Sequence, residues 1–85
     1  MKVPLLLLID LRGDKSKPHV CAELSTRIKV QLLDDQHQLT CRISEVEPDV
    51  VVFEFDYPDI CCLKALEHTK AAFPSIPILM VTEQH

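Results

Sequence analysis

Four short apolar runs, separated by segments with helical periodicity, constrain the fold of this 85-residue chain more than any other feature. Each run has the length of a strand and is rich in aliphatic residues. The runs are Leu5–Ile9, Ile28–Leu33, Val50–Phe53 and Ile76–Val81. Because strands alternate with helical segments, the sequence predicts an α/β fold with a parallel sheet and right-handed crossovers, in one domain spanning residues 1–85.

The second run differs from the other three in its pattern. Its apolar residues alternate with Lys29 and Gln31, whereas the other runs are apolar on both faces. Continuous apolar strands are typical of the interior of a parallel sheet, and alternation fits a strand with one face in water. We therefore expect the second strand at an edge. This favours the strand order 2-1-3-4 of flavodoxin-like folds, in a three-layer α/β/α arrangement.

Helical periodicity marks the three connecting segments. In the first, Ser16 is a suitable N-cap, and apolar residues recur at four-residue steps as far as Ile28. The second begins near Asp35 and repeats its apolar residues at i, i+4 and i+7, at Leu39, Ile43 and Val46. The third begins near Asp59, and its predicted buried stripe consists of Ile60, Leu63, Leu66 and Phe73.

Composition and charge argue against several classes of function. The net charge is −4 and the basic residues are scattered, which argues against a nucleic-acid interface in this segment. No stretch approaches the about 20 apolar residues of a membrane span. The apolar stretch near the N-terminus is too short for a signal peptide, so we expect a cytoplasmic protein. The four cysteines are interpreted as small apolar residues, and the spacing of the four histidines indicates no zinc site.

Acidic and hydroxyl side chains lie at the ends of three predicted strands. Asp10 ends the first, Glu54 ends the third with Asp56 two residues later, and Thr82 ends the fourth. In open parallel sheets, sites form beyond the carboxyl ends of the strands. These three strands are neighbours in the order 2-1-3-4, so we expect Asp10, Glu54 and Thr82 to converge on one patch. The alternative is that such acids only solvate the sheet edge or cap helices.

The stretch PDVVVFEFDYPD, Pro48–Asp59, resembles the third strand and following loop of receiver domains in bacterial two-component response regulators. The family pattern is Pro-Asp, four apolar residues, the phospho-accepting Asp, three residues and a second Pro-Asp. LLLLIDLR, Leu5–Arg12, resembles the family's first strand, and PILMVTEQ, Pro77–Gln84, resembles its fourth. The resemblance covers nearly the whole chain in order. It implies a flavodoxin-like receiver fold that lacks its last strand and helix, and a role in signal transduction.

The chain departs from the family pattern at its most important positions. Carried over by position, the phospho-acceptor falls on Glu54, and the two acids that hold Mg²⁺ fall on Asp10 and Leu11. Leu11 cannot bind a cation, so the resemblance implies at most a weak Mg²⁺ site in a remnant acidic pocket of Asp10, Glu54 and Asp56. Thr82 matches the hydroxyl that contacts the phosphoryl group. Glu54 is one methylene longer than Asp, so it would act as a partial mimic of that group.

These departures indicate an atypical receiver, or pseudo-receiver, that is not an enzyme and does not undergo ordinary phosphorylation. It would regulate an output module, often one for transcription, through protein contacts, with a sensor kinase as a further candidate partner. The apolar strand Ile76–Val81 would leave an open edge, so either the natural chain continues, as the N-terminal part of a longer regulator, or a partner covers the edge. For the second case we expect a homodimer through Ile76–Val81. Two alternatives remain: an active Mg²⁺-dependent phospho-receiver, and a dimerisation or scaffold module that binds no ligand.

Overall fold

The computed structural model describes residues 3–13, 28–33, 38–56 and 60–82, which contain four strands and two helices. In chain order these are β1 (Leu5–Asp10), β2 (Lys29–Leu33), α1 (Leu39–Val46), β3 (Val50–Phe55), α2 (Ile60–Ala72) and β4 (Ile78–Thr82). The predicted helix after Ser16 lies outside the described residues.

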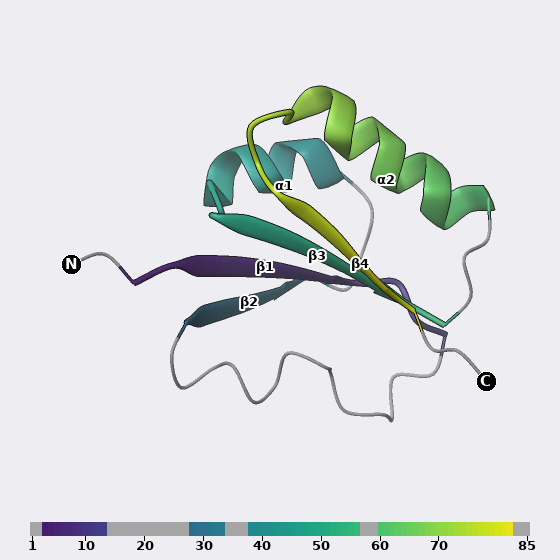
Figure 1. Ribbon diagram of the computed structural model, residues 1–85, viewed down its shortest axis with the longest axis horizontal. Coiled ribbons are helices and arrows are strands. Elements are labelled where there is room, and N and C mark those ends of the chain that lie inside the picture. Colours follow the sequence, from purple (N-terminus) through teal and green to yellow (C-terminus); the bar gives the residue numbers. More distant parts are fainter. Residues whose placement is uncertain (1–2, 14–27, 34–37, 57–59, 83–85) are drawn as a thin grey trace.

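The four strands form one parallel sheet with the order β2-β1-β3-β4 (Figure 1). This is the order that the sequence predicted, and the alternating strand β2 lies at an edge. The two central strands, β1 and β3, are buried along most of their length. Their continuous apolar sequences fit this position, because a central strand of a parallel sheet has neither face in water.

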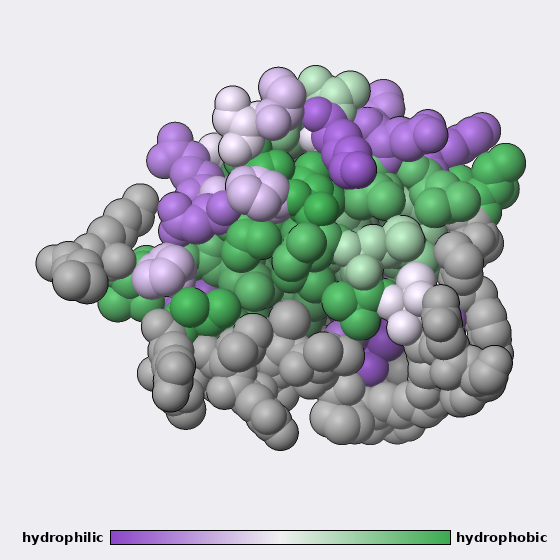
Figure 2. Space-filling view, in the orientation of Figure 1, coloured by the Kyte–Doolittle hydropathy of each residue, from purple (hydrophilic) through white to green (hydrophobic). Residues whose placement is uncertain are grey.

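Both described helices cover the same face of the sheet (Figure 1). The connections from β2 to β3 and from β3 to β4 cross the sheet in the same direction, and right-handed crossovers then place both helices on one side. Figure 2 shows hydrophilic side chains on the outer surface of the two helices and a hydrophobic band below them. The core between sheet and helices consists of Leu7, Ile9, Val51, Phe53, Phe55, Leu39, Ile43 and Cys62.

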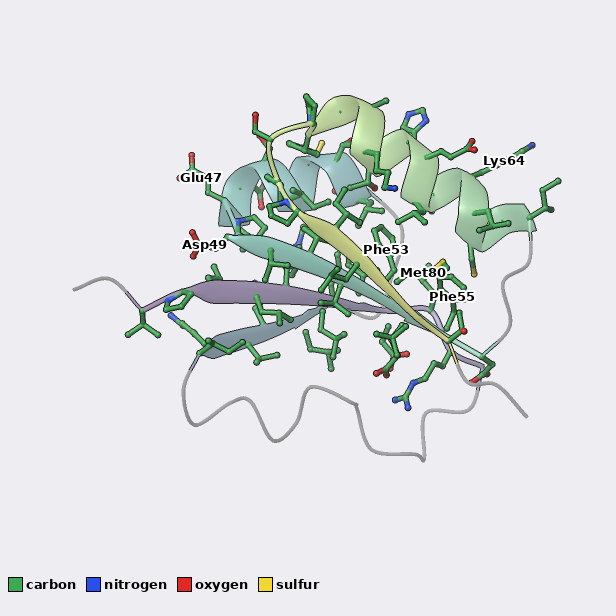
Figure 3. The ribbon with its side chains drawn as sticks, in the orientation of Figure 1. Glu47, Asp49, Phe53, Phe55, Lys64 and Met80 are labelled. Atoms are coloured by element: carbon green, nitrogen blue, oxygen red, sulfur yellow. The ribbon has the colours of Figure 1, made fainter. Side chains whose placement is uncertain are left out.

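A second, smaller cluster lies on the opposite face of the sheet. Its buried members are Leu6, Leu8 and Val52, which alternate along β1 and β3 with the residues of the main core. This alternation assigns each position of β1 and β3 to one of the two faces. Figure 3 shows Phe53 and Phe55 on the side of the helices. The predicted third layer falls on a segment outside the described residues.

The carboxylate of Asp49 fastens the amino ends of β1 and β3 together. Its Oδ2 accepts a hydrogen bond of 2.7 Å from the backbone N–H of Leu5. The N–H of Asp49 donates in turn to the carbonyl of Leu5, at 2.8 Å. The first Pro-Asp pair of the motif therefore aligns the two central strands at the end of the sheet opposite the candidate site.

The buried stripe predicted for the third helix is partly wrong. Ile60 and Leu63 are exposed on α2, and the buried positions are Cys62 and Thr69 instead. Small side chains at these positions let the helix lie close to the sheet. The hydroxyl of Thr69 donates a 2.8 Å hydrogen bond to the carbonyl of Ala65, so its burial leaves no unsatisfied polar group.

Glu47 ends α1 in the left-handed conformation, with φ 51° and ψ 57°. Its N–H donates to the carbonyl of Ile43 at 2.9 Å, which satisfies one of the last carbonyls of the helix. This helix-ending geometry favours glycine, because a Cβ makes the left-handed region unfavourable by about 1–2 kcal/mol.

We expect Glu47→Gly to raise the free energy of unfolding by about 0.5–1 kcal/mol, because relief of the left-handed strain exceeds the added entropy of the unfolded chain. Glu45→Gly is the matched control inside the same helix, and it should lower that free energy by about 1 kcal/mol. Urea unfolding followed by circular dichroism measures both. A loss of stability in both variants would contradict the backbone strain assigned to Glu47 in the left-handed conformation.

Candidate functional site

Two carboxylates lie side by side where β1 and β3 end. Asp10 and Glu54 are direct partners in the β1–β3 register. Alternation along each strand places both side chains on the face opposite the helices, because their neighbours Ile9 and Phe53 belong to the core under α1 and α2. The two residues are only 2% and 3% exposed. Buried acids on adjacent strands repel each other and lose hydration, so they need a counter-charge.

Arg12 supplies this counter-charge. Its Nε lies 3.0 Å from Oδ1 of Asp10 and 3.0 Å from Oε1 of Glu54. Its Nη2 donates to the second oxygen of Asp10 at 3.3 Å. The arginine is itself 7% exposed, so all three charges are buried together. A planar guanidinium suits this role, because its fixed fork of N–H donors can serve two carboxylates at once.

Backbone hydrogen bonds hold the arginine in this position. The N–H of Arg12 donates to Oδ1 of Asp10 at 3.0 Å, a local turn in which an Asp side chain accepts from the residue two positions later. The N–H of Leu11 donates to the carbonyl of Glu54 at 2.8 Å. The N–H of Gly13 donates to Oδ2 of Asp56 at 2.9 Å. The segment 11–13 is thus fastened to the end of β3, and we name Asp10, Arg12, Glu54 and Asp56 the Arg12 cluster.

The surrounding acids raise the pKa of Arg12 above its ordinary value. The hydrogen bond with Asp10 has the largest effect, and burial opposes it. The negative charges of Glu54, Asp10 and Asp56 raise the pKa further. A guanidinium is protonated at neutral pH even without such help, so the cation of this cluster is permanent.

Thr82 lies at the same end of the sheet but pairs with Phe55 in the β3–β4 register. Alternation therefore assigns Thr82 to the face of Phe55, under the helices, whereas Asp10 and Glu54 belong to the other face. Among the predicted site residues, the structure brings Asp10, Glu54 and Asp56 together through the segment 11–13. Thr82 is close to them along the strand direction but on the opposite side of the sheet.

Sequence reasoning did not single out Arg12. The sequence did contain a signal, because Arg12 follows the acid Asp10 by two positions at the end of a strand. At this spacing, a turn stabilised by the Asp side chain brings the two residues into contact. Leu11, which holds the position of the second acid in the receiver pattern, packs against the core under the helices. It therefore adds no ligand to the Arg12 cluster.

The described residues contain no group of three or more His, Cys, Asp or Glu side chains arranged to hold a metal ion. Within the Arg12 cluster, the guanidinium bonds both carboxylate oxygens of Asp10 and lies 3.0 Å from Oε1 of Glu54. In the same part of the chain, Cys41 and Cys61 are exposed and Cys62 is buried, all as free thiols. Neither α1 nor α2, the helices that the structure describes, is long and apolar enough to cross a membrane.

Replacement of Arg12 by methionine should lower the free energy of unfolding by about 3–5 kcal/mol, because it leaves two buried carboxylates without a counter-charge. Arg42→Met is the control. Arg42 is exposed and lies 3.7 Å from an exposed Glu45, so its loss should change the stability by about 0.5 kcal/mol or less. Chemical denaturation measures both variants. Equal losses of stability in the two variants would show that Arg12 does not act as a buried counter-charge.

A second comparison separates charge from packing. Adding Asp10→Asn and Glu54→Gln to Arg12→Met should restore part of the lost stability, because the uncompensated charges are then gone. If the triple variant is less stable than Arg12→Met alone, the loss comes from packing around the arginine stem.

Arg12→Lys should make the stability depend on alkaline pH. A lysine ammonium has an ordinary pKa of ~10.4, and the two carboxylates would raise it in the folded state. A raised folded pKa means that this contribution is complete below the unfolded value and is lost as the pH rises through the folded one. The difference in stability between wild type and Arg12→Lys should therefore grow above pH ~10.4. A difference that stays constant to higher pH would contradict the ion pairing.

Comparisons with protein-family models, curated proteins and solved structures found no significant match to this chain.

Proposed function

We propose that this chain is an atypical receiver-like signalling domain that regulates an output module through protein contacts, without ordinary phosphorylation. The observation that carries this proposal is the burial of Arg12 between Asp10 and Glu54, 3.0 Å from an oxygen of each. This is the end of the sheet where the receiver resemblance places a cation and a phosphoryl group.

The arrangement of the sheet supports a flavodoxin-like receiver fold. The order β2-β1-β3-β4, with both described helices on one face, is compatible with the first four strands of such a fold. The three receiver-like motifs fall on β1, β3 and β4, which are neighbours. Glu54 then occupies the position of the phospho-acceptor at the carboxyl end of a central strand.

Three features at this end of the sheet argue against phosphoryl transfer. The guanidinium takes the place of a divalent cation, which that reaction needs to neutralise phosphate charge. Leu11 packs into the core and offers no oxygen. Glu54 is buried and ion-paired, so its carboxylate is not presented to a phosphate donor.

The same contacts suggest what the domain does instead. In a phosphorylated receiver, a phosphoryl group and a cation would hold the strand ends by charge. Here the negative carboxylate of Glu54 would stand in for the phosphoryl group and the positive guanidinium of Arg12 for the cation. The two form a permanent ion pair. The proposed domain is therefore fixed in one state at this site. Its signal depends on which protein it contacts, a sensor kinase or an output module for transcription.

A rebuilt site tests the proposal. We expect wild type to take up no phosphoryl group from a small acyl phosphate with Mg²⁺. The combined variant Arg12→Asp, Glu54→Asp should gain one, because it removes the guanidinium, adds a second acid at a position that contacts Asp10, and supplies an aspartate nucleophile. The phosphoryl group would pass from the acyl phosphate to the new aspartate, and the acyl carboxylate would leave. Intact-protein mass spectrometry detects the added group.

The control variant Arg12→Asp keeps Glu54 and should bind Mg²⁺ without phosphorylation. Amide NMR of the wild type should show no saturable shift at Asp10 or Glu54 on Mg²⁺ titration. Phosphorylation of wild type would favour the active phospho-receiver instead. A folded rebuilt variant that binds Mg²⁺ but never takes up phosphate would count against the receiver proposal.

A further inference from the structure

A groove follows the seam between α1 and α2. Three hollows, of about 380, 490 and 370 Å³, lie along this seam. The first and second share Thr40 in the first turn of α1, and the second and third share Ser44 and Phe73. Because adjacent hollows share lining residues, they form one continuous groove. It extends from Gln38, which precedes α1, to Glu47, which ends it, and we name it the α1–α2 groove.

Apolar side chains line the α1–α2 groove along its length. Leu39 and Ala65 lie in the first hollow, and Phe73 and Ile76 lie in the third. Phe73 and Ile76 are half-buried, so part of each side chain remains open to the groove. Both also pack against the core, which holds them in place. Aromatic residues are enriched at protein interfaces, so a fixed, partly exposed phenyl ring in a groove indicates a protein contact.

The two ends of the α1–α2 groove carry opposite charge. Lys64 and His68 line the first hollow, and no acidic residue among those described lines it. Glu45 and Glu47 line the other two hollows. Within the described residues, neither Lys64 nor Glu47 takes part in an ion pair, whereas Glu45 lies 3.7 Å from Arg42. Figure 3 shows Lys64 and Glu47 at opposite ends of the helical layer.

This charge pattern is the reverse of the one that stabilises a helix such as α1. Acids in the first turn and bases in the last turn offset the helix dipole, and α1 has neither. Its N-cap residue, Gln38, makes no side-chain capping hydrogen bond. The positive end of α1 therefore lies beside Lys64, and its negative end carries Glu47. Charge and dipole add along the groove, which leaves both ends in need of an opposite charge.

We propose that the α1–α2 groove binds an amphipathic helix of a partner protein, aligned antiparallel to α1 and α2. The two helices run in the same direction, because each belongs to a crossover between parallel strands. An antiparallel partner helix brings its C-terminal carbonyls to Lys64 and its N-terminal N–H groups to Glu47, so each end meets the opposite charge. Its apolar stripe contacts Phe73, as in other complexes of a helix in a groove.

A partner helix fits this groove better than a second copy of the same face. Figure 2 shows hydrophilic side chains on the outer surface of the two helices, so two such faces would bury charges without filling either groove. A single helix presents a ridge of side chains that packs between two others. A partner helix parallel to α1 would bring like charges together at both ends, so the groove also specifies a direction. The proposal does not rest on the receiver-like function.

A synthetic peptide with a fluorescein label serves as the probe. It has about 12–15 residues, the length at which an isolated helix begins to form in water, with leucines at i, i+3, i+4 and i+7. Arginines in its first turn and glutamates in its last turn complement the groove in the antiparallel direction. Fluorescence anisotropy should show saturable binding to wild type. Glu47→Lys and Lys64→Glu should each weaken binding about fivefold, because each replaces an attraction by a repulsion.

Lys70→Glu is the matched control. It makes the same change of charge on α2, but Lys70 follows His68 by two residues and so lies about 200° around the helix axis, away from the groove. It should leave the affinity unchanged. The substituted side chains are all exposed, and circular dichroism establishes that the three variants are folded.

Amide NMR tests the location and the direction of the bound peptide. The peptide should shift the signals of Thr40, Ser44 and Phe73, and a nitroxide at its N-terminus should broaden the signal of Glu47 more than that of Lys64. The proposal is overturned if wild type does not bind the peptide at millimolar concentration, if Lys70→Glu weakens binding as much as Lys64→Glu, or if the nitroxide broadens Lys64 instead. None of these outcomes involves phosphate or Mg²⁺, so the result is distinct from the test of the receiver-like function.

Discussion

The ion cluster of Asp10, Arg12 and Glu54 is the constraint on which the site end of the sheet depends. The register of β1 and β3 places two carboxylates on adjacent positions in a buried part of the molecule. Such an arrangement is stable only with a cation of matching geometry between them. Because the cation is a side chain two residues beyond the strand end, it also fixes the path of the chain as it leaves β1.

A covalently attached cation changes what this end of the sheet can do. A metal ion exchanges with solvent and can respond to a phosphate donor, whereas Arg12 remains in place and stays charged. The cluster therefore stabilises one state instead of switching between two. In the signalling role proposed above, regulation would come from association with another protein. At the two ends of the described sheet, β2 carries the polar residues Lys29 and Gln31, whereas β4 is uncharged.

Much of the fold follows from hydrophobic patterning alone. Continuous apolar runs identified the buried strands β1 and β3, because a strand covered on both faces has no polar positions. The alternation around Lys29 and Gln31 identified β2 as an edge. Acids at the ends of neighbouring parallel strands predicted that Asp10 and Glu54 would lie together, since carboxyl ends meet at one edge of such a sheet. These features depend only on local period and strand order.

Other features were decided by tertiary structure. Arg12 acts as a counter-ion because a turn brings its side chain back over the ends of β1 and β3. The sequence spacing of Asp10 and Arg12 alone does not determine how far that turn reaches. Thr82 lies on the opposite face from Asp10 and Glu54 because the β3–β4 register pairs it with Phe55. The rotation of α2 follows from packing, which favours small Cys62 and Thr69 over Ile60 at the sheet. The sequence by itself determined the strands, their order and the acids at their ends. Register, helix rotation and the pairing of buried charges required the folded chain, because each depends on contacts between residues distant in sequence or on the exact path of a turn.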